Sequence, residues 1–111
     1  MPKDFLIVVV RDFSTRPYGR YYKDGDRSGA KFRDEFLLPA LQNNDHVTVD
    51  LTGYNLYGRS FIDEAFGGLI REGGYSLSDL QDKLTIRHDD VPPVVALAWS
   101  RIAHASKSKK R

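Results

Sequence analysis

Residues 47–74 constrain the fold of this chain more than any other part, because they predict a strand, a loop and a helix in direct succession. Apolar and polar residues alternate over 47–51, which is the pattern of a strand. A glycine-containing loop follows, and from Ser60 the apolar residues recur at helical spacing up to a Gly73-Gly74 stop. Such a strand–loop–helix unit is the building block of α/β folds.

Ser60 stands where this helix is predicted to begin, and three roles suit a serine there. Free backbone N–H groups and the positive end of the helix dipole point outward at a helix start. The Ser60–Asp63 spacing matches a capping box and favours an ordinary N-cap. The same position also suits an anion site or a phosphorylated serine, and the spacing leaves all three open. Gly67-Gly68 inside the helix costs stability, which predicts a close approach of the helix to the sheet or to a partner.

The remaining segments predict a single α/β domain with a central mixed or parallel sheet of about four strands flanked by helices. Further strands are expected over 5–10 and 85–88, with a short one over 19–22, and further helices over 28–41, 76–84 and from residue 92 onward. The unbroken apolar run at 5–10 predicts a strand covered on both faces. Pro39 predicts a kink or an early end of its helix. Ser28 is expected to cap that helix.

Length and charge predict one core and one basic end. With 111 residues, 41% of them hydrophobic, the chain has room for one domain, over 1–105, and a flexible basic tail over 106–111. Without the four cations of 107–111, the 17 basic side chains fall to 13 against 15 acidic ones. The pI near 8.9 therefore reflects the tail rather than a basic binding face. Lacking cysteine, a long apolar run and a signal-peptide pattern, the sequence favours a cytoplasmic protein.

Neither a catalytic set nor a metal-binding set is recognisable. His46, His88 and His104 have no ligand-like spacing to one another or to carboxylates. Asp63 and Glu64 are adjacent, and neighbours on a helix do not share a face. No phosphate-cradling GxxxxGK[ST], GxSxG or HExxH motif occurs. We therefore expect a protein that is not an enzyme and that uses no cofactor or metal.

Segment 16–27 mixes arginine and tyrosine, a composition that can stack on bases and pair with phosphates. Acidic residues within it reduce its positive charge, and hairpin tyrosines also serve in packing or in protein contacts. Its residues are thus candidates for either a nucleic-acid or a partner contact. These candidates are Arg16, Tyr18, Arg20, Tyr21 and Tyr22.

Several motifs together resemble a known bacterial family, the STAS-like domain of unknown function. The motifs are Arg16-Pro-Tyr-Gly-Arg-Tyr-Tyr, Phe32-Arg-x-x-Phe-Leu-x-Pro-x-Leu41, Val49-Asp-Leu and Ser60-Phe-Ile-Asp-Glu-Ala-Phe-Gly-Gly-Leu69. The resemblance spans about residues 5 to 90. The family is related in name and presumed fold to sulfate-transporter and anti-sigma-factor-antagonist domains, so the resemblance implies a small domain with a sheet on one side and helices on the other.

The resemblance also implies a regulatory role without enzymatic activity. In anti-sigma-factor antagonists, an ATP-binding kinase partner phosphorylates a Ser or Thr at the start of the second main helix and breaks the complex. Laid over that motif, Ser60 takes the phosphorylated position. Gly58 and Phe61 depart from the usual acidic residue and glycine, and Arg59 replaces a small residue and can pair with phosphate. The implied partner-binding or switch residues are Ser60, Arg59, Gly58, Tyr57, Phe61, Asp63 and Glu64.

Two alternatives remain beside a module that binds a kinase, an anti-sigma-type protein or another protein. One is a nucleic-acid-associated protein that uses segment 16–27 and the basic tail. The other is a phage-type inhibitor that blocks the surface of another protein. The regulatory module is our first hypothesis, because the motifs resemble the STAS-like family and no catalytic set is recognisable.

Overall fold

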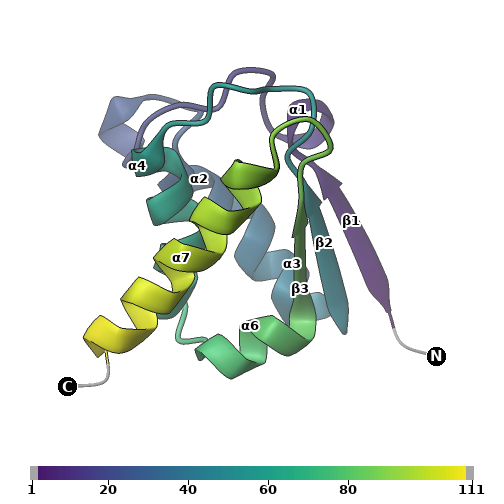
Figure 1. Ribbon diagram of the computed structural model, residues 1–111, viewed down its shortest axis with the longest axis vertical. Helices are drawn as coiled ribbons and strands as arrows, with labels where there is room; N and C mark the ends of the chain where they lie inside the picture. Colours follow the sequence, from purple (N-terminus) through teal and green to yellow (C-terminus); the bar gives the residue numbers. More distant parts are fainter. Residues whose placement is uncertain (1–2, 110–111) are drawn as a thin grey trace.

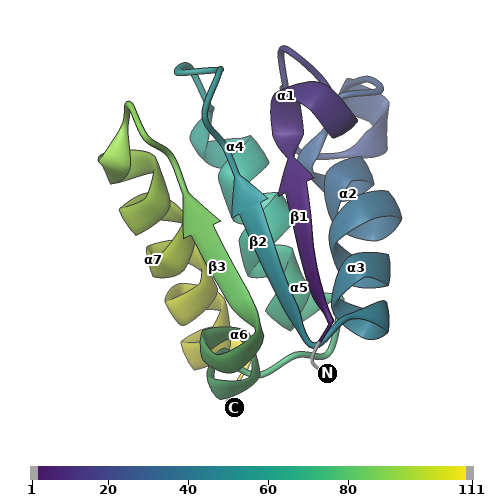
Figure 2. The same ribbon diagram turned by 90° about the vertical axis from the view of Figure 1, so that its right-hand side faces the viewer.

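Three parallel strands form the sheet of this protein, whose computed structural model describes residues 3–109. Strand β2 (His46–Asp50) lies between β1 (Asp4–Val8) and β3 (Leu84–Arg87). The sheet faces the viewer in Figure 2, with the main helices behind it. The single α/β domain with a parallel sheet and flanking helices is as predicted, but the sheet has three strands rather than about four.

The missing strand is the one predicted over 19–22. Gly19 has a φ of +94°, a value that interrupts an extended chain and that glycine adopts freely. The chain then forms a short 3₁₀ helix, η1 (Tyr22–Asp24), in place of a strand. The Asp24 carboxylate accepts hydrogen bonds from the backbone N–H groups of Arg20 and Tyr21, at 3.1 and 2.9 Å. These bonds to a side chain take up donors that a strand would offer to a neighbouring strand.

Strand β1 is covered on one face only, so the predicted coverage of both faces is wrong. Ile7 is 2% exposed and belongs to the core, whereas the next side chain toward the N-terminus, Leu6, is 45% exposed. The strand also ends earlier than predicted, because the chain turns at Val9 into the short helix α1 (Val9–Asp12). There the Asp12 carboxylate accepts a hydrogen bond from the Val8 N–H at 2.8 Å.

The first long helix follows the loop of residues 14–28 and includes a π-helical turn. Its three parts are α2 (Gly29–Phe32), the π-helical η2 (Arg33–Leu37) and α3 (Leu38–Asn43). Ser28 caps it as predicted, accepting a hydrogen bond from the Lys31 N–H at 3.2 Å. The helix does not end at Pro39 but continues to Asn43. The change from π-helical to α-helical hydrogen bonding lies just before Pro39, where the proline has no N–H to contribute.

The second long helix carries the segment that begins near Ser60, and it too contains a π-helical turn. Its parts are α4 (Arg59–Ile62), the π-helical η3 (Asp63–Gly67) and α5 (Gly68–Arg71). It lies behind the sheet in Figure 2, and every residue from Phe61 to Ile70 is buried. Phe61 stacks on Phe32 with ring centroids 6.0 Å apart, which joins the starts of the two long helices.

Helices α6 (Leu77–Lys83) and α7 (Pro92–Lys109) complete the layer of helices. Helix α7 packs along η3 and α5, on the left in Figure 1. It continues to Lys109, past residue 106, where the sequence placed the start of the tail. Residues 110 and 111 of that predicted tail lie outside the described residues, so its flexibility stays a prediction. No helix within residues 3–109 combines the length and the apolar character needed to cross a membrane.

A buried histidine fixes the loop that leads to α4. His88, 4% exposed, accepts hydrogen bonds at Nδ1 from the Asp90 and Val91 N–H groups, at 3.1 and 3.0 Å. Its Nδ1 therefore carries no proton, and Nε2–H donates to the Tyr54 carbonyl at 2.9 Å. The Tyr57 hydroxyl donates to the Leu51 carbonyl at 3.1 Å, which holds the loop from the other side.

Candidate functional site

The two regions that the sequence singled out, segment 16–27 and the helix start near Ser60, meet in one pocket of about 310 Å³. They are some forty residues apart in the chain, and Figure 1 shows both near the upper end of the molecule, beside the start of α4. The pocket is lined by Tyr18, Gly19, Arg20, Asp24, Gly58, Arg59, Ser60 and Phe61. The structure therefore unites the two predicted regions in a single candidate site.

Ser60 is not the N-cap of its helix, so the predicted capping box is wrong. Helix α4 begins at Arg59 with Gly58 as N-cap, and no side chain bonds to the cap position. Asp63, the predicted reciprocal partner, is turned toward arginine side chains instead. Ser60 is exposed in the first helical turn, as is the neighbouring Arg59. The serine hydroxyl is thus accessible in a region of favourable potential for negative charge.

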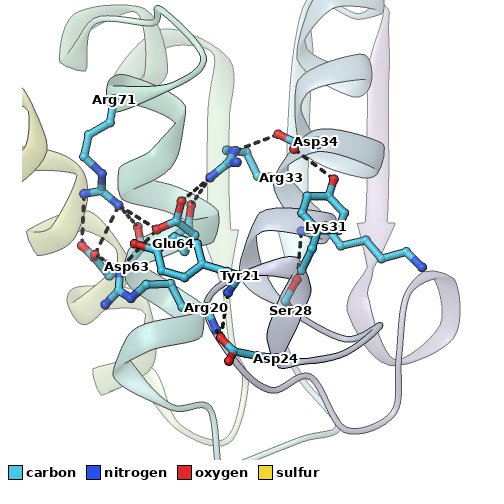
Figure 3. A network of polar contacts seen from close by, with 11 residues as sticks. Arg20, Tyr21, Asp24, Ser28, Lys31, Arg33, Asp34, Asp63, Glu64 and Arg71 are labelled. Carbon is cyan, nitrogen blue, oxygen red and sulfur yellow. Dashed lines mark hydrogen bonds and ion pairs between the residues drawn. The ribbon is translucent and has the colours of Figure 1, made fainter.

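Asp63 and Glu64 are buried and bind the same arginines, contrary to the prediction that they do not share a face. Arg20 Nη1 lies 2.6 Å from Asp63 Oδ2 and 3.2 Å from Glu64 Oε1, and Arg71 also reaches both carboxylates, at 3.2 and 3.5 Å. Figure 3 shows the two carboxylates side by side. Both lie in the π-helical turn η3, and the long arginine side chains bridge them.

Two further arginines complete this network, which joins the second long helix to α7 and η2. Arg101 Nε of α7 lies 2.8 Å from Asp63 Oδ1. Arg33 Nη1 lies 2.6 Å from Glu64 Oε2 and also donates to the Glu64 carbonyl at 3.3 Å. Four guanidinium groups therefore surround two carboxylates, and each carboxylate has more than one cationic partner.

Electrostatics in this network favour the ionised form of Asp63. Burial by itself raises the pKa of Asp63, but hydrogen bonds from Arg20 and Arg101 and the charge of Arg71 outweigh it and lower the pKa to about 2. The hydrogen bond from Arg20 to Asp63 raises the pKa of Arg20, and this effect outweighs burial, which lowers the same pKa. Asp63 is therefore ionised at neutral pH.

The Gly67-Gly68 pair makes room for the arginines rather than for the sheet or a partner. A Cβ atom on Gly68 would lie 2.6 Å from Arg33 Nη1 and 3.0 Å from Arg33 Cδ. A Cβ atom on Gly67 would lie 2.9 Å from Arg71 Nη1 and 3.2 Å from the Arg101 carbonyl oxygen. The predicted close approach exists, but the approaching groups come from neighbouring helices and from the same helix.

Exposed tyrosines and a leucine lie in segment 16–27 and in the loop before α4, and both of these parts of the chain contribute residues to the pocket. Tyr18 is 65% exposed and lines the pocket, and Tyr21 and Tyr22 are about half exposed. Leu56, in the loop before α4, is 79% exposed. Arg16 is also exposed. Tyrosine and arginine are the residue types that protein interfaces favour.

The predicted site residues divide into exposed and buried groups. Ser60, Arg59 and Gly58 are exposed, whereas Phe61 is 1% exposed and Tyr57 is 9% exposed. Burial also raises the pKa of the Tyr57 hydroxyl, with the charge of Asp50 adding to the effect. Tyr57 therefore remains a neutral donor that supports the loop.

Three members of the network, Arg33, Arg71 and Arg101, were not predicted from the sequence. The available signal was the Asp63-Glu64 pair, because two adjacent acids within an otherwise apolar helix need cationic partners when they are buried. Over residues 3–109, no group of three or more His, Cys, Asp or Glu side chains is placed to hold a metal ion.

Comparison with protein families agrees with the observed fold. The model of the family described as the STAS-like domain of unknown function matches residues 28–92, from the cap of α2 to the first residue of α7. The chain belongs to this family. The match includes both long helices, β2, β3 and the acidic pair of the STAS-like domain. Arg20 and the exposed Tyr18, Tyr21 and Tyr22 lie before the matched residues. No curated protein and no solved structure matched the chain.

Proposed function

We propose that this STAS-like domain is a non-enzymatic regulatory module that binds a protein partner through the exposed helix start at Ser60 and the adjoining segment 16–27. The observation that carries the proposal is the shared pocket, in which Ser60 and Arg59 lie beside Tyr18 and Arg20. One continuous surface then offers aromatic rings, a cationic side chain and a modifiable hydroxyl, a combination suited to protein recognition.

Phosphorylation of Ser60 is the proposed switch, and an ATP-binding kinase or anti-sigma-type protein is the proposed partner. A phosphoryl group on Ser60 adds about −1.5 to −2 charges at the positive end of a helix, where such charge is tolerated. The domain therefore keeps its fold. A partner packed on the same surface loses a neutral contact and must accommodate a charge instead, so its affinity falls.

The alternative of nucleic-acid binding has weaker support from the charges around the pocket. Arg59 and Arg20 line it, but Asp24 lines it too and repels a phosphate backbone. A direct check is binding to DNA and RNA at low salt. Affinity that falls steeply with salt and is lost in the Arg16→Ala, Arg20→Ala double variant would favour nucleic acid over a protein partner.

The experiment that tests the proposed function is affinity purification from the native cell with mass spectrometry and phosphosite mapping in one run. The baits are the wild type, Ser60→Ala and Ser60→Asp. We expect one partner to be enriched with the wild type and Ser60→Ala, and depleted with Ser60→Asp. Equal recovery with all three baits would eliminate the switch, and a wild-type sample with no specific partner would contradict the binding function.

A further inference from the structure

Arg20 connects the pocket to the buried network. Its side chain lines the pocket together with Ser60, yet its Nη1 binds Asp63 at 2.6 Å and Glu64 at 3.2 Å. Of the four arginines in the network, Arg20 is the one that lines this pocket. Figure 3 shows its side chain extending from segment 16–27 toward the two carboxylates.

The spacing along the helix places Ser60 on the same helix face as the two carboxylates that bind the Arg20 guanidinium. Asp63 and Glu64 follow Ser60 by three and four residues, so all three side chains project from one helix face. About one helical turn, or about 5.4 Å along the helix axis, separates Ser60 from the two acidic residues. Rotation of the Arg20 side chain covers such a distance, while the Arg20 backbone stays bound to Ala30 N–H at 3.0 Å and to Asp24 at 3.1 Å.

Departure of Arg20 leaves no buried carboxylate without a cation. Asp63 retains Arg101 at 2.8 Å and Arg71 at 3.2 Å, and Glu64 retains Arg33 at 2.6 Å. The large penalty for an unpaired buried charge is therefore avoided. Because a phosphoryl group carries more charge than either carboxylate, it competes effectively for the guanidinium.

We infer that Arg20 is a phosphate-responsive arm, which binds Asp63 and Glu64 when Ser60 is unmodified and turns to the phosphoryl group when Ser60 is phosphorylated. The inference rests on the proposed phosphorylation of Ser60. In that step a kinase transfers the γ-phosphoryl group of a nucleoside triphosphate to Ser60 Oγ. The bond to the departing nucleoside diphosphate breaks as the Oγ–P bond forms, and the hydroxyl proton passes to solvent.

Movement of the arm changes the surface that a partner meets. The Arg20 guanidinium carbon lies 6.0 Å from the centroid of the half-exposed Tyr21 ring, within range of a cation–π contact. When Arg20 turns toward Ser60, Tyr21 loses this contact and its ring reorients. The phosphoryl group therefore alters both the charge of the pocket and the position of an adjacent aromatic side chain.

The test uses the purified full chain with phosphoserine incorporated at position 60 during translation, and it needs no partner. Phosphorus NMR over a pH series measures the second pKa of the phosphoryl group in three proteins. The first has no further change, the second carries Arg20→Gln and the third carries Arg16→Gln. A contact with Arg20 lowers that pKa by about one unit. We expect the Arg20→Gln protein to lose this lowering, and the Arg16→Gln protein, changed at an exposed arginine of the same segment, to keep it.

A second measurement does not use the Arg20→Gln variant, so it tests the inference even if that variant fails to fold. Amide NMR signals of the otherwise wild-type protein, with and without the phosphoryl group, should show shifts at Asp63, Glu64 and Tyr21 in addition to those at residues 58–62. Shifts confined to 58–62, or equal phosphate pKa values in all three folded proteins, would overturn the inference. Either result leaves partner binding and its loss on phosphorylation untouched, so the two proposals fail separately.

Discussion

Arg33 and Glu64 form a buried ion pair in which Nη1 and Oε2 are 2.6 Å apart and the two side chains are 8% and 6% exposed. The pair joins the π-helical turn of the first long helix to that of the second. Because Glu64 also binds Arg20, the same carboxylate supports the candidate site at the surface. The buried network thus holds Arg20, one of the residues that line the pocket.

Removing the Glu64 carboxylate should strongly destabilise the fold. Glu64→Ala leaves Arg33 buried without this partner, and we expect the free energy of unfolding to fall by about 3 kcal/mol. Urea denaturation, monitored by circular dichroism, measures this free energy of unfolding. Arg11→Ala is the matched control, because the Arg11 side chain is 62% exposed in its pair with Asp12, and its effect should be far smaller than that of Glu64→Ala. Similar losses for the two variants would contradict a structural role for the network.

Adding a methyl group at Gly68 should destabilise the protein, although alanine is the better helix former. The new Cβ would lie 2.6 Å from Arg33 Nη1, so Gly68→Ala displaces the arginine and costs about 1–3 kcal/mol. Thermal unfolding monitors the change. The control is Gly58→Ser, since a Cβ at Gly58 meets nothing within 4 Å, and the serine adds a cap worth a few tenths of a kcal/mol. A rise in stability for Gly68→Ala would show that the arginine is not held there.

The stability of the protein should decrease in acid partly because of Asp63. Its pKa is lowered from 3.8 to about 2 in the folded protein, so its contribution is complete above the unfolded pKa and is lost as the pH falls toward 2. The contribution amounts to about 2 kcal/mol. Urea denaturation from pH 5 to pH 2 should show a decrease in wild type that exceeds the decrease in Asp63→Asn by roughly this amount. Parallel curves would contradict the assignment.

His88 should stabilise the start of α7 and the loop before α4 together. His88→Ala leaves the Asp90 and Val91 N–H groups without their acceptor and the Tyr54 carbonyl without its donor, at a cost of about 1–3 kcal/mol. Hydrogen exchange should accelerate at residues 90–91. The control variant is His104→Ala, because His104 is an exposed histidine of α7. Unchanged exchange in His88→Ala would rule out this bridging role.

The elements that follow strong local patterns were predictable from sequence. Ser28 and Ser76 each cap a helix, and Ser76 forms a capping box with Asp79, because a serine before an apolar helical run satisfies free N–H groups locally. The β2 strand and the α7 helix with its initial prolines follow equally local signals. Periodicity and caps depend on near neighbours in the chain, so the sequence contains them directly.

The features that depend on distant residues were not predictable in the same way. The coverage of β1 on one face only follows from where the helices pack, and the apolar run itself carries no sign of it. The partners of Asp63 and Glu64 come from four separate parts of the chain, including Arg20 and Arg101. The shift of the N-cap from Ser60 to Gly58 has the same origin, since Asp63 faces those arginines and not the helix start.

The most direct test of partner binding is the dissociation constant of the purified domain for the protein that co-purifies with it, measured by titration calorimetry. We expect the dissociation constant to increase about tenfold for Tyr18→Ala and for Arg59→Ala, equivalent to about 1.4 kcal/mol each. Thr85→Ala, on the exposed outer face of β3, should bind as wild type does. Full affinity in Tyr18→Ala and Arg59→Ala, with loss in Thr85→Ala, would place the partner on the sheet and contradict partner binding at the Ser60 pocket.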